Sequence, residues 1–146
     1  MLLGCKPGRT VSTCRLQLIA LNLPYPPSIN AYWLASGHRR YISKRGVLFR
    51  QAVADYVSEW NVSKLGDQPV MIHIVLQPRS KKLMDIDNCA KAILDSIEHA
   101  GVINSDVQVE RLVIERGQTI KGGGCRVLIE VLPSDSSESS FPQGNS

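Results

Sequence analysis

Asp85 and Asp87 are the residues of this 146-residue chain whose type and spacing could most directly do chemistry. If the backbone between them is extended, both carboxylates point to one side and Ile86 points to the other. Two like charges this close repel each other and raise one pKa, so they persist as a pair mainly around a cation. Mg²⁺ prefers oxygen ligands, keeps water and substrate phosphate in its other positions, and can activate water at a phosphodiester. The pair therefore predicts a magnesium site.

Lys91 and Asp106 could complete this site. Lys91 stands four residues after Asp87, on the same face of the expected helix. Asp106 follows a reversal at Gly101 that can carry it back toward the strand ends. Three carboxylates and one lysine would then converge, which suits a site that handles phosphodiesters. Simpler roles also exist, because Asp87 can cap the helix and Asp106 can be a turn residue. Lys91 can likewise form an ion pair with Asp95.

The basic residues are distributed unevenly along the chain. The formal net charge is +4, yet no acidic residue precedes Asp55. Positive potential along this stretch predicts a polyanionic partner, with nucleic acid first among the candidates, or simply a solvated basic face. The candidates for phosphate contacts, from this stretch and from the segment before Asp85, are Arg39, Arg40, Lys44, Arg45, Arg79, Lys81 and Lys82.

Strands that could position these residues are predicted from alternating apolar side chains. The first is expected over residues 16–21 and ends before the prolines at 24, 26 and 27. The second is expected over residues 70–76 and ends before Pro78. Two more strands, 107–115 and 126–132, are joined across the glycine-rich residues 121–124 and are expected to form a hairpin.

Two helices are predicted from helical spacing. Ser43 can cap the first, whose core-facing residues would be Phe49, Val53, Tyr56, Val57 and Trp60. The second is expected over residues 87–100, with Gly101 ending it, and residues 28–40 are expected to be a loop. The fold class is therefore α+β, a two-layer arrangement with a mixed sheet of about four to five strands, two helices on it, and the order βαβαββ.

One domain is expected at residues 15–133, between a flexible N-terminal extension at 1–14 and a disordered Ser-rich tail at 134–146. No apolar run approaches the roughly 18 residues that a membrane span needs, so no membrane partner is expected. The cysteines at 5, 14, 89 and 125 lack the paired spacing of a zinc knuckle or a disulfide framework. This usage favours reduced thiols in the cytoplasm.

The motifs and their spacing resemble the RusA family of Holliday-junction resolvases. The matching residues are Asp-Ile-Asp-Asn at 85–88, Lys91, Ala-Gly-Val-Ile at 100–103 and Asp-Val-Gln-Val at 106–109. Leu-Pro-Tyr-Pro-Pro-Ser-Ile-Asn at 23–30 and Arg-Tyr-Ile-Ser at 40–43 resemble the family's proline-rich opening and its approach to the first helix. The similarity covers residues 16–132.

The resemblance implies a homodimeric enzyme of phages and prophages that cuts four-way DNA junctions by paired nicks and needs Mg²⁺ or Mn²⁺. Carried over by position, Asp85, Asp87 and Asp106 would be the metal ligands and Lys91 the essential cation, with Asn88 in a supporting role. Members often carry successive acidic residues before the third ligand, where this chain has Ser105. A symmetric dimer could present one active site to each of two strands related by a two-fold axis.

Two other functions would use the same carboxylates. A phosphohydrolase for a small nucleotide is one, although Gly122–Gly124 lacks the Lys-Ser or Lys-Thr sequel and the helix of a phosphate-binding loop. A non-catalytic DNA-binding module, in which the aspartates cap, turn and pair, is the other. No helix-turn-helix or zinc-finger pattern is present, so DNA would be recognised by shape and phosphate placement.

Overall fold

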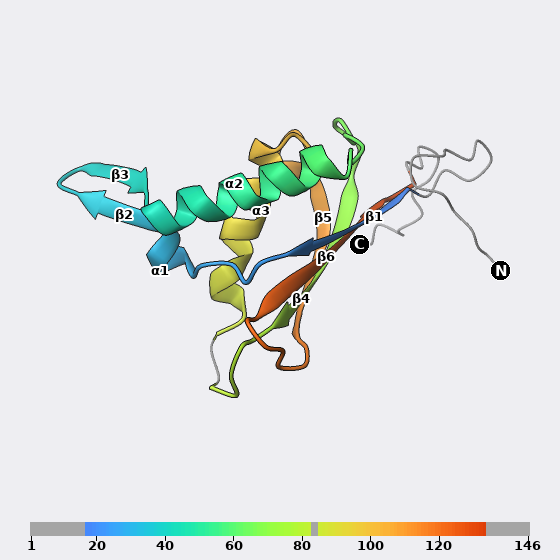
Figure 1. Ribbon diagram of the computed structural model, residues 1–146. Helices are drawn as coiled ribbons and strands as arrows, with labels where there is room; N and C mark the ends of the chain where they lie inside the picture. The colour runs from blue at the N-terminus through green and yellow to red at the C-terminus, as the bar shows by residue number, and fades with distance from the viewer. Residues whose placement is uncertain (1–16, 83–84, 134–146) are drawn as a thin grey trace, which may run out of the picture.

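A computed structural model describes residues 17–82 and 85–133 of the chain. The predicted N-terminal extension and Ser-rich tail lie outside these residues. The main sheet has four strands in the order β1-β6-β4-β5, with β4 parallel to β5 and antiparallel to β6 (Figure 1). The strands are β1 (Leu18–Leu23), β4 (Val70–Gln77), β5 (Val109–Arg116) and β6 (Gly124–Val131).

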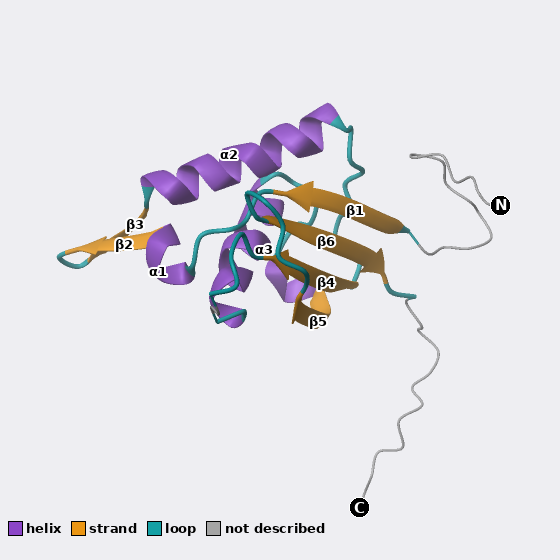
Figure 2. Cartoon of the chain, turned by 60° about the horizontal axis from the view of Figure 1, so that its bottom comes forward, coloured by secondary structure: helices purple, strands orange, loops and turns teal. Residues whose placement is uncertain are grey.

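Two helices, α2 (Lys44–Glu59) and α3 (Ala90–His99), cover one face of this sheet (Figure 2). Shorter helical pieces are α1 (Ile29–Tyr32), η1 (Asp87–Cys89) and η2 (Asp106–Gln108). The predicted α+β class, with two long helices on a mixed sheet, is confirmed. Within the described part of the chain, no helix is both long enough and apolar enough to cross a membrane.

Strand β4 is the centre of the core. Its residues alternate between buried and half-buried, and Ile72 and Ile74 are fully buried against Ile93 and Ile97 of α3 in one cluster. Each such isoleucine contributes roughly 1.5–3 kcal/mol through burial. On α2, the predicted core residues Phe49, Val53 and Val57 are buried and Tyr56 packs against the cluster. Trp60 was expected inside but is 64% exposed, because the helix ends at Glu59 and Trp60 lies beyond its last turn.

The prediction of a loop over residues 28–40 is wrong. Ser28 caps α1 by accepting a hydrogen bond from the Ala31 N–H (3.3 Å), and strands β2 (Trp33–Ser36) and β3 (Arg39–Ile42) then form a separate hairpin. This hairpin arm, residues 33–42, extends away from the rest of the fold (Figures 1 and 2). Gly37 supplies the positive φ of 65° that its tight turn requires.

Both ends of the arm are tied to the first turn of α2. The Ser43 N–H donates to the Tyr32 carbonyl (2.8 Å), and the Ser43 hydroxyl donates to the carbonyl of Ala31. The same hydroxyl oxygen caps α2 by accepting from the Gly46 N–H (3.0 Å). Only glycine fits at position 46, because a Cβ there would lie 2.9 Å from the Tyr32 carbonyl oxygen.

The predicted hairpin of the last two strands is also wrong, because β4 lies between β5 and β6. Parallel neighbours need a crossover, and α3 provides it between β4 and β5. Residues 117–123 then cross the end of β4, where the Gly117 N–H donates to the Leu76 carbonyl (2.7 Å) and the Ile120 N–H to the Pro78 carbonyl (2.9 Å). The buried strand β4 therefore pairs with both β5 and β6, which a local hairpin would have paired with each other.

Candidate active site

Asp85 and Asp87, called here the turn pair, lie where the chain enters α3. Ile86 between them has φ −76° and ψ −28°, so the segment is a helical turn and the expected extended conformation is wrong. Both carboxylates are exposed, and neither forms an ion pair with a residue that the structure describes. Asp85 accepts a hydrogen bond from the Asn88 side-chain amide (3.4 Å). The turn pair therefore presents negative charge that no described protein cation offsets by direct contact.

Apolar neighbours fix this turn with its carboxylates outward. Cys89 is 2% exposed, and its thiol donates weakly to the Pro26 carbonyl (3.8 Å). Ile86 packs against the core as well. Burial raises the pKa of the Cys89 thiol, which keeps it neutral beside the aspartates. The alternation of polar and apolar residues over 85–89 thus turns the acids toward solvent.

Lys91 and Asp106, expected to approach each other, are in contact. The Lys91 ammonium lies 3.0 Å from an Asp106 carboxylate oxygen and 3.2 Å from one of Asp95. The simpler pairing with Asp95 therefore coexists with the contact to Asp106. The hydrogen bond that Lys91 donates to Asp106 is the main cause that raises the pKa of Lys91, so the side chain stays cationic through the neutral range.

Local backbone chemistry holds Asp106 in place. Ser105 caps η2 through a capping box with Gln108, whose side-chain oxygen accepts from the Ser105 N–H (3.0 Å). The Gln108 amide also donates to the carbonyl of Gly66 (2.8 Å), which ties η2 to the loop before β4. Ser105 is therefore a cap that positions Asp106.

Asp106 belongs to a second acidic group, called here the carboxylate triad: Asp95, Glu98 and Asp106. One oxygen from each lies within 4.8 Å of the others. Among the described residues this is the group with metal-like spacing, and the turn pair is not part of it. Asp95 was expected only as an ion-pair partner and Glu98 was not singled out. Their spacing along α3 places both on one helical face with Lys91, and this is the signal that could have identified them.

The two acidic groups lie toward different ends of α3. The turn pair precedes its first residue, after the end of β4. Asp106 follows α3 and precedes β5, whose first residue pairs with the first residue of β4. Lys91, in the first turn of α3, contacts Asp95 and Asp106, both members of the carboxylate triad. Its described partners therefore belong to the triad, and none belongs to the turn pair.

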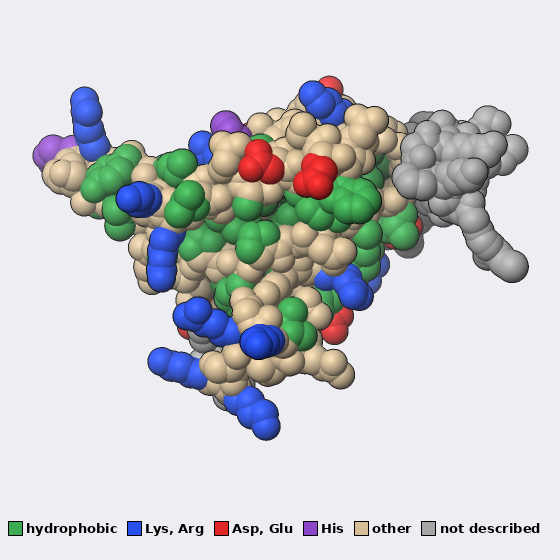
Figure 3. Space-filling model, in the orientation of Figure 1, with side chains coloured by type: hydrophobic (Ala, Val, Ile, Leu, Met, Phe, Trp, Pro, Cys, Tyr) green, Lys and Arg blue, Asp and Glu red, His purple; other side chains and the backbone are tan. Residues whose placement is uncertain are grey.

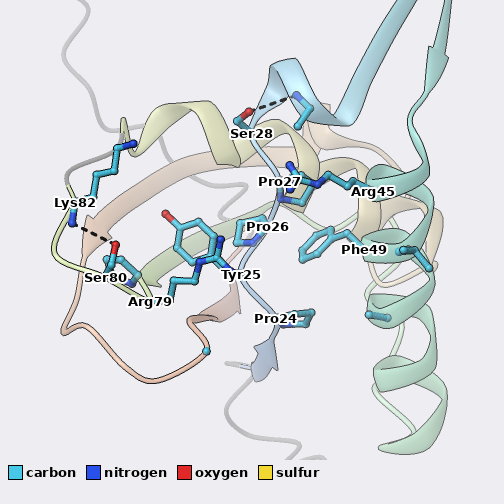
Figure 4. A pocket seen from close by; sticks show the side chains of 15 residues that line it. Pro24, Tyr25, Pro26, Pro27, Ser28, Arg45, Phe49, Arg79, Ser80 and Lys82 are labelled. Atoms are coloured by element: carbon cyan, nitrogen blue, oxygen red, sulfur yellow. Dashed lines mark hydrogen bonds between the residues drawn. The ribbon is translucent and has the colours of Figure 1, made fainter.

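Three of the seven predicted phosphate-contacting residues converge. Arg45, Arg79 and Lys82 line one pocket of about 670 Å³ (Figure 4). Figure 3 shows Lys and Arg side chains gathered along the lower part of this face, where Asp and Glu side chains are less prominent than above. The other four are exposed but do not line the pocket: Arg39 and Arg40 on the hairpin arm, Lys44 on α2, and Lys81 after β4.

Comparisons with known proteins agree with the motifs. Residues 24–132 match the family described as Endodeoxyribonuclease RusA. The chain is 32% identical over 112 residues to the crossover junction endodeoxyribonuclease of Enterobacteria phage HK97, which covers 77% of this chain and 93% of the phage protein. It is 30% identical over 109 residues to that of Enterobacteria phage 82 (75% and 91%) and 29% identical over 110 residues to RusA of Escherichia coli K12 (75% and 92%).

Proposed function

This chain belongs to the RusA endodeoxyribonuclease family, and we propose that it is a Mg²⁺-dependent endonuclease that resolves four-way DNA junctions by paired, symmetric nicks. The observation that carries this proposal is the contact of Lys91 with Asp106, together with a turn pair at the start of the same helix whose charge no described protein cation offsets by direct contact. Together these residues provide oxygen donors for a hard cation and an ammonium group for a phosphate. Convergence of Arg45, Arg79 and Lys82 supports a DNA substrate.

The donor types fit a magnesium ion. Asp85, Asp87 and Asp106 would hold it, since Mg²⁺ takes carboxylate oxygens and retains water and substrate phosphate as its other ligands. Among the described residues Asp106 has metal-like spacing with Asp95 and Glu98 and not with the turn pair, so the turn pair would have to approach Asp106 when the metal binds. When bound, the metal supplies a polarised water and offsets the charge that develops on the phosphate. Mn²⁺ has similar ligand preferences and should substitute.

Lys91 would act on the phosphate itself. The Lys91 side chain is 45% exposed, so a substrate can reach its ammonium group while Asp95 and Asp106 contact it. A cation in this position can stabilise charge on the pentavalent phosphorus centre or on the leaving oxygen. Asn88 would support the site through its hydrogen bond to Asp85.

The hairpin arm supports a homodimer. An isolated two-stranded ribbon is marginally stable in water, and this one exposes 40% of Leu34 and 48% of Tyr41. Contact with a second copy would cover these side chains and give the two active sites that paired nicks need. The free thiols Cys89 and Cys125 favour a reducing compartment, the cytoplasm of a bacterial or phage-infected cell, as the place of action.

The test compares substrates under otherwise equal conditions. A synthetic four-way junction, a linear duplex of the same sequence and free nucleotides are incubated with the protein, with Mg²⁺ and with a chelator. We expect cutting of the junction alone, by nicks placed symmetrically in two strands, and none with chelator. Hydrolysis of nucleotides would favour a phosphohydrolase, and junction binding without cutting a non-catalytic DNA-binding module. Binding should weaken steeply as salt rises, and a flat response would count against phosphate contacts.

A further inference from the structure

The pocket lined by Arg45, Arg79 and Lys82 is an open groove with three sides (Figure 4). The proline-rich segment 24–28 forms its floor, and one wall is formed by Pro78, Arg79, Ser80 and Lys82. The other wall is a single stripe of α2, made of residues at helical spacing: Arg45, Leu48, Phe49 and Ala52. Its volume of about 670 Å³ lies within the range of roughly 300–1,000 Å³ that ligand sites occupy.

The groove combines an apolar floor with cationic sides. Tyr25 and three prolines lie between Arg45 on the α2 side and Arg79 and Lys82 on the other (Figure 4). No residue that lines the groove is acidic. Its positive sides therefore complement a polyanion. Its apolar floor complements a flat, apolar surface of that ligand rather than further phosphate groups.

Unpaired nucleotides have this combination of chemistry. In a duplex the base faces are stacked inside and only edges and phosphates are accessible, so an apolar floor would contact little. In a single strand each base exposes a face that can lie on an aromatic ring, while the phosphates reach lysine and arginine. Lys82 stands three residues before Asp85, so its Cα lies within about 11 Å of the Cα of that member of the turn pair.

We propose that this groove binds a short stretch of unpaired DNA, with bases against Tyr25 and the prolines and with phosphates on Arg45, Arg79 and Lys82. The inference rests on the proposed function: the unpaired nucleotides in the groove would be those close to the bond that the enzyme cuts. At the crossover of a junction the strands part, so nucleotides there can leave the stack and enter the groove.

A pair of α2 variants tests the groove. Leu48 lines it and is 63% exposed, whereas its neighbour Val47 is 51% exposed and does not line it. Leu48→Glu places a carboxylate in the groove, and Val47→Glu adds the same charge outside it. Binding of a fluorescein-labelled oligo(dT) of about twelve nucleotides is measured by anisotropy, with Ca²⁺ in place of Mg²⁺. We expect Leu48→Glu to raise the Kd about tenfold and Val47→Glu less than about threefold.

Two further measurements do not depend on Leu48. Arg79→Gln with Lys82→Gln should flatten the plot of log binding constant against log salt by about 0.7 for each lost phosphate contact, and Arg111→Gln on the far strand β5 should not. An oligonucleotide that carries 5-iododeoxyuridine should form its main photo-crosslink to Tyr25, identified by mass spectrometry of the peptides.

The outcomes separate the groove from the nuclease activity. Equal weakening by both glutamate variants, an unchanged salt slope, or a main crosslink outside the groove would overturn the groove assignment, even if the wild-type protein cuts junctions. Tighter binding of an equally long duplex than of the single strand would overturn it too. Conversely, if the wild-type protein cuts no junction but the expected binding and crosslink are found, the proposed function fails and the groove stands. Circular dichroism checks that each variant is folded.

Discussion

The turn pair and the carboxylate triad are two acidic groups at one helix that differ in how their charge is balanced. In the triad, Asp95 and Asp106 both contact the Lys91 ammonium, at 3.2 and 3.0 Å. The turn pair has no such contact with a described cation, and its two carboxylates are exposed. A metal ion approaching the triad meets a positive charge already in place, whereas one approaching the turn pair does not.

This difference teaches that spacing and charge balance point to different metal sites on the same helix. The triad has the tighter spacing, with oxygens within 4.8 Å, yet part of its charge is already neutralised. A cation gains most where negative charge is otherwise unbalanced. We therefore propose that the metal binds at the turn pair, which Asp106 would join from the triad, and that Asp95 holds Lys91.

The largest effect is expected at the turn pair itself. Asp85→Asn should slow cutting of a four-way junction by about a thousandfold, because losing a metal ligand removes several kcal/mol of transition-state stabilisation. Junction binding in Ca²⁺, measured by gel shift, should stay close to that of the wild type. Asp55→Asn, a substitution of the same type on α2, is the matched control. Cutting retained by Asp85→Asn under Mg²⁺ would remove Asp85 from the catalytic set.

Lys91 comes second, because it is the cation that balances two carboxylates of the triad and is accessible to a substrate phosphate. Lys91→Met should slow the single-turnover rate about a hundredfold, the usual scale for removing one group that stabilises transition-state charge. Lys91→Arg keeps the charge and should recover part of the rate. Equal rates for Lys91→Met and the wild type would mean that the lysine only balances the triad.

Asp95 tests whether the triad positions the lysine. Asp95→Asn leaves the contact of Lys91 with Asp106, so the rate should fall only about tenfold, as for loss of a supporting partner. The pKa of Lys91 should also fall, since Asp95 contributes to raising it. NMR titration of the labelled lysine measures this shift, and an unchanged pKa would argue against the positioning role.

Glu98 should matter least for cutting. Glu98→Gln is expected to change the rate within about twofold, the scale of an ordinary surface substitution. A loss as large as that of Asp85→Asn would place the metal in the triad and reverse the assignment made here.

Thermal unfolding tests whether Mg²⁺ binds at the turn pair or at the triad, and it does so without an assay of cutting. At Mg²⁺ ten times above its Kd, binding adds about 1.4 kcal/mol to the free energy of unfolding. For a domain of this size that raises the Tm by about 3–6 °C. The increase should vanish in Asp85→Asn and persist in Glu98→Gln, and the opposite result would contradict the comparison.

The core and the chemistry-bearing segment could be predicted because they depend on local patterns. The period-two burial of β4 follows directly from its alternating residues, and the capped helices from their spacing. The partners of β4 could not be predicted in this way, because β5 and β6 each pair more favourably with this buried strand than with each other. Pairing is a competition across the whole fold, and a glycine-rich connection between two strands does not decide it.

The candidate site shows the same limit. Lys91 meets Asp106 as the helix period and the reversal at Gly101 suggested, with a φ of 87° at that glycine. The helical backbone at Ile86 was missed, because its neighbours Asp85 and Asp87 read equally well as a strand end. The hairpin arm was missed because strands of four residues with mostly exposed side chains carry little periodicity.

The way the arm is rooted has a mechanical consequence. Its two ends meet at Tyr32 and Ser43, and both are hydrogen-bonded at the start of α2, where Gly46 leaves no slack against the Tyr32 carbonyl. The hairpin arm is therefore attached rigidly to α2, and we expect the two to move together. If two copies contacted each other through their hairpin arms, the distance between their active sites would be fixed by the rigid attachment of each arm to α2.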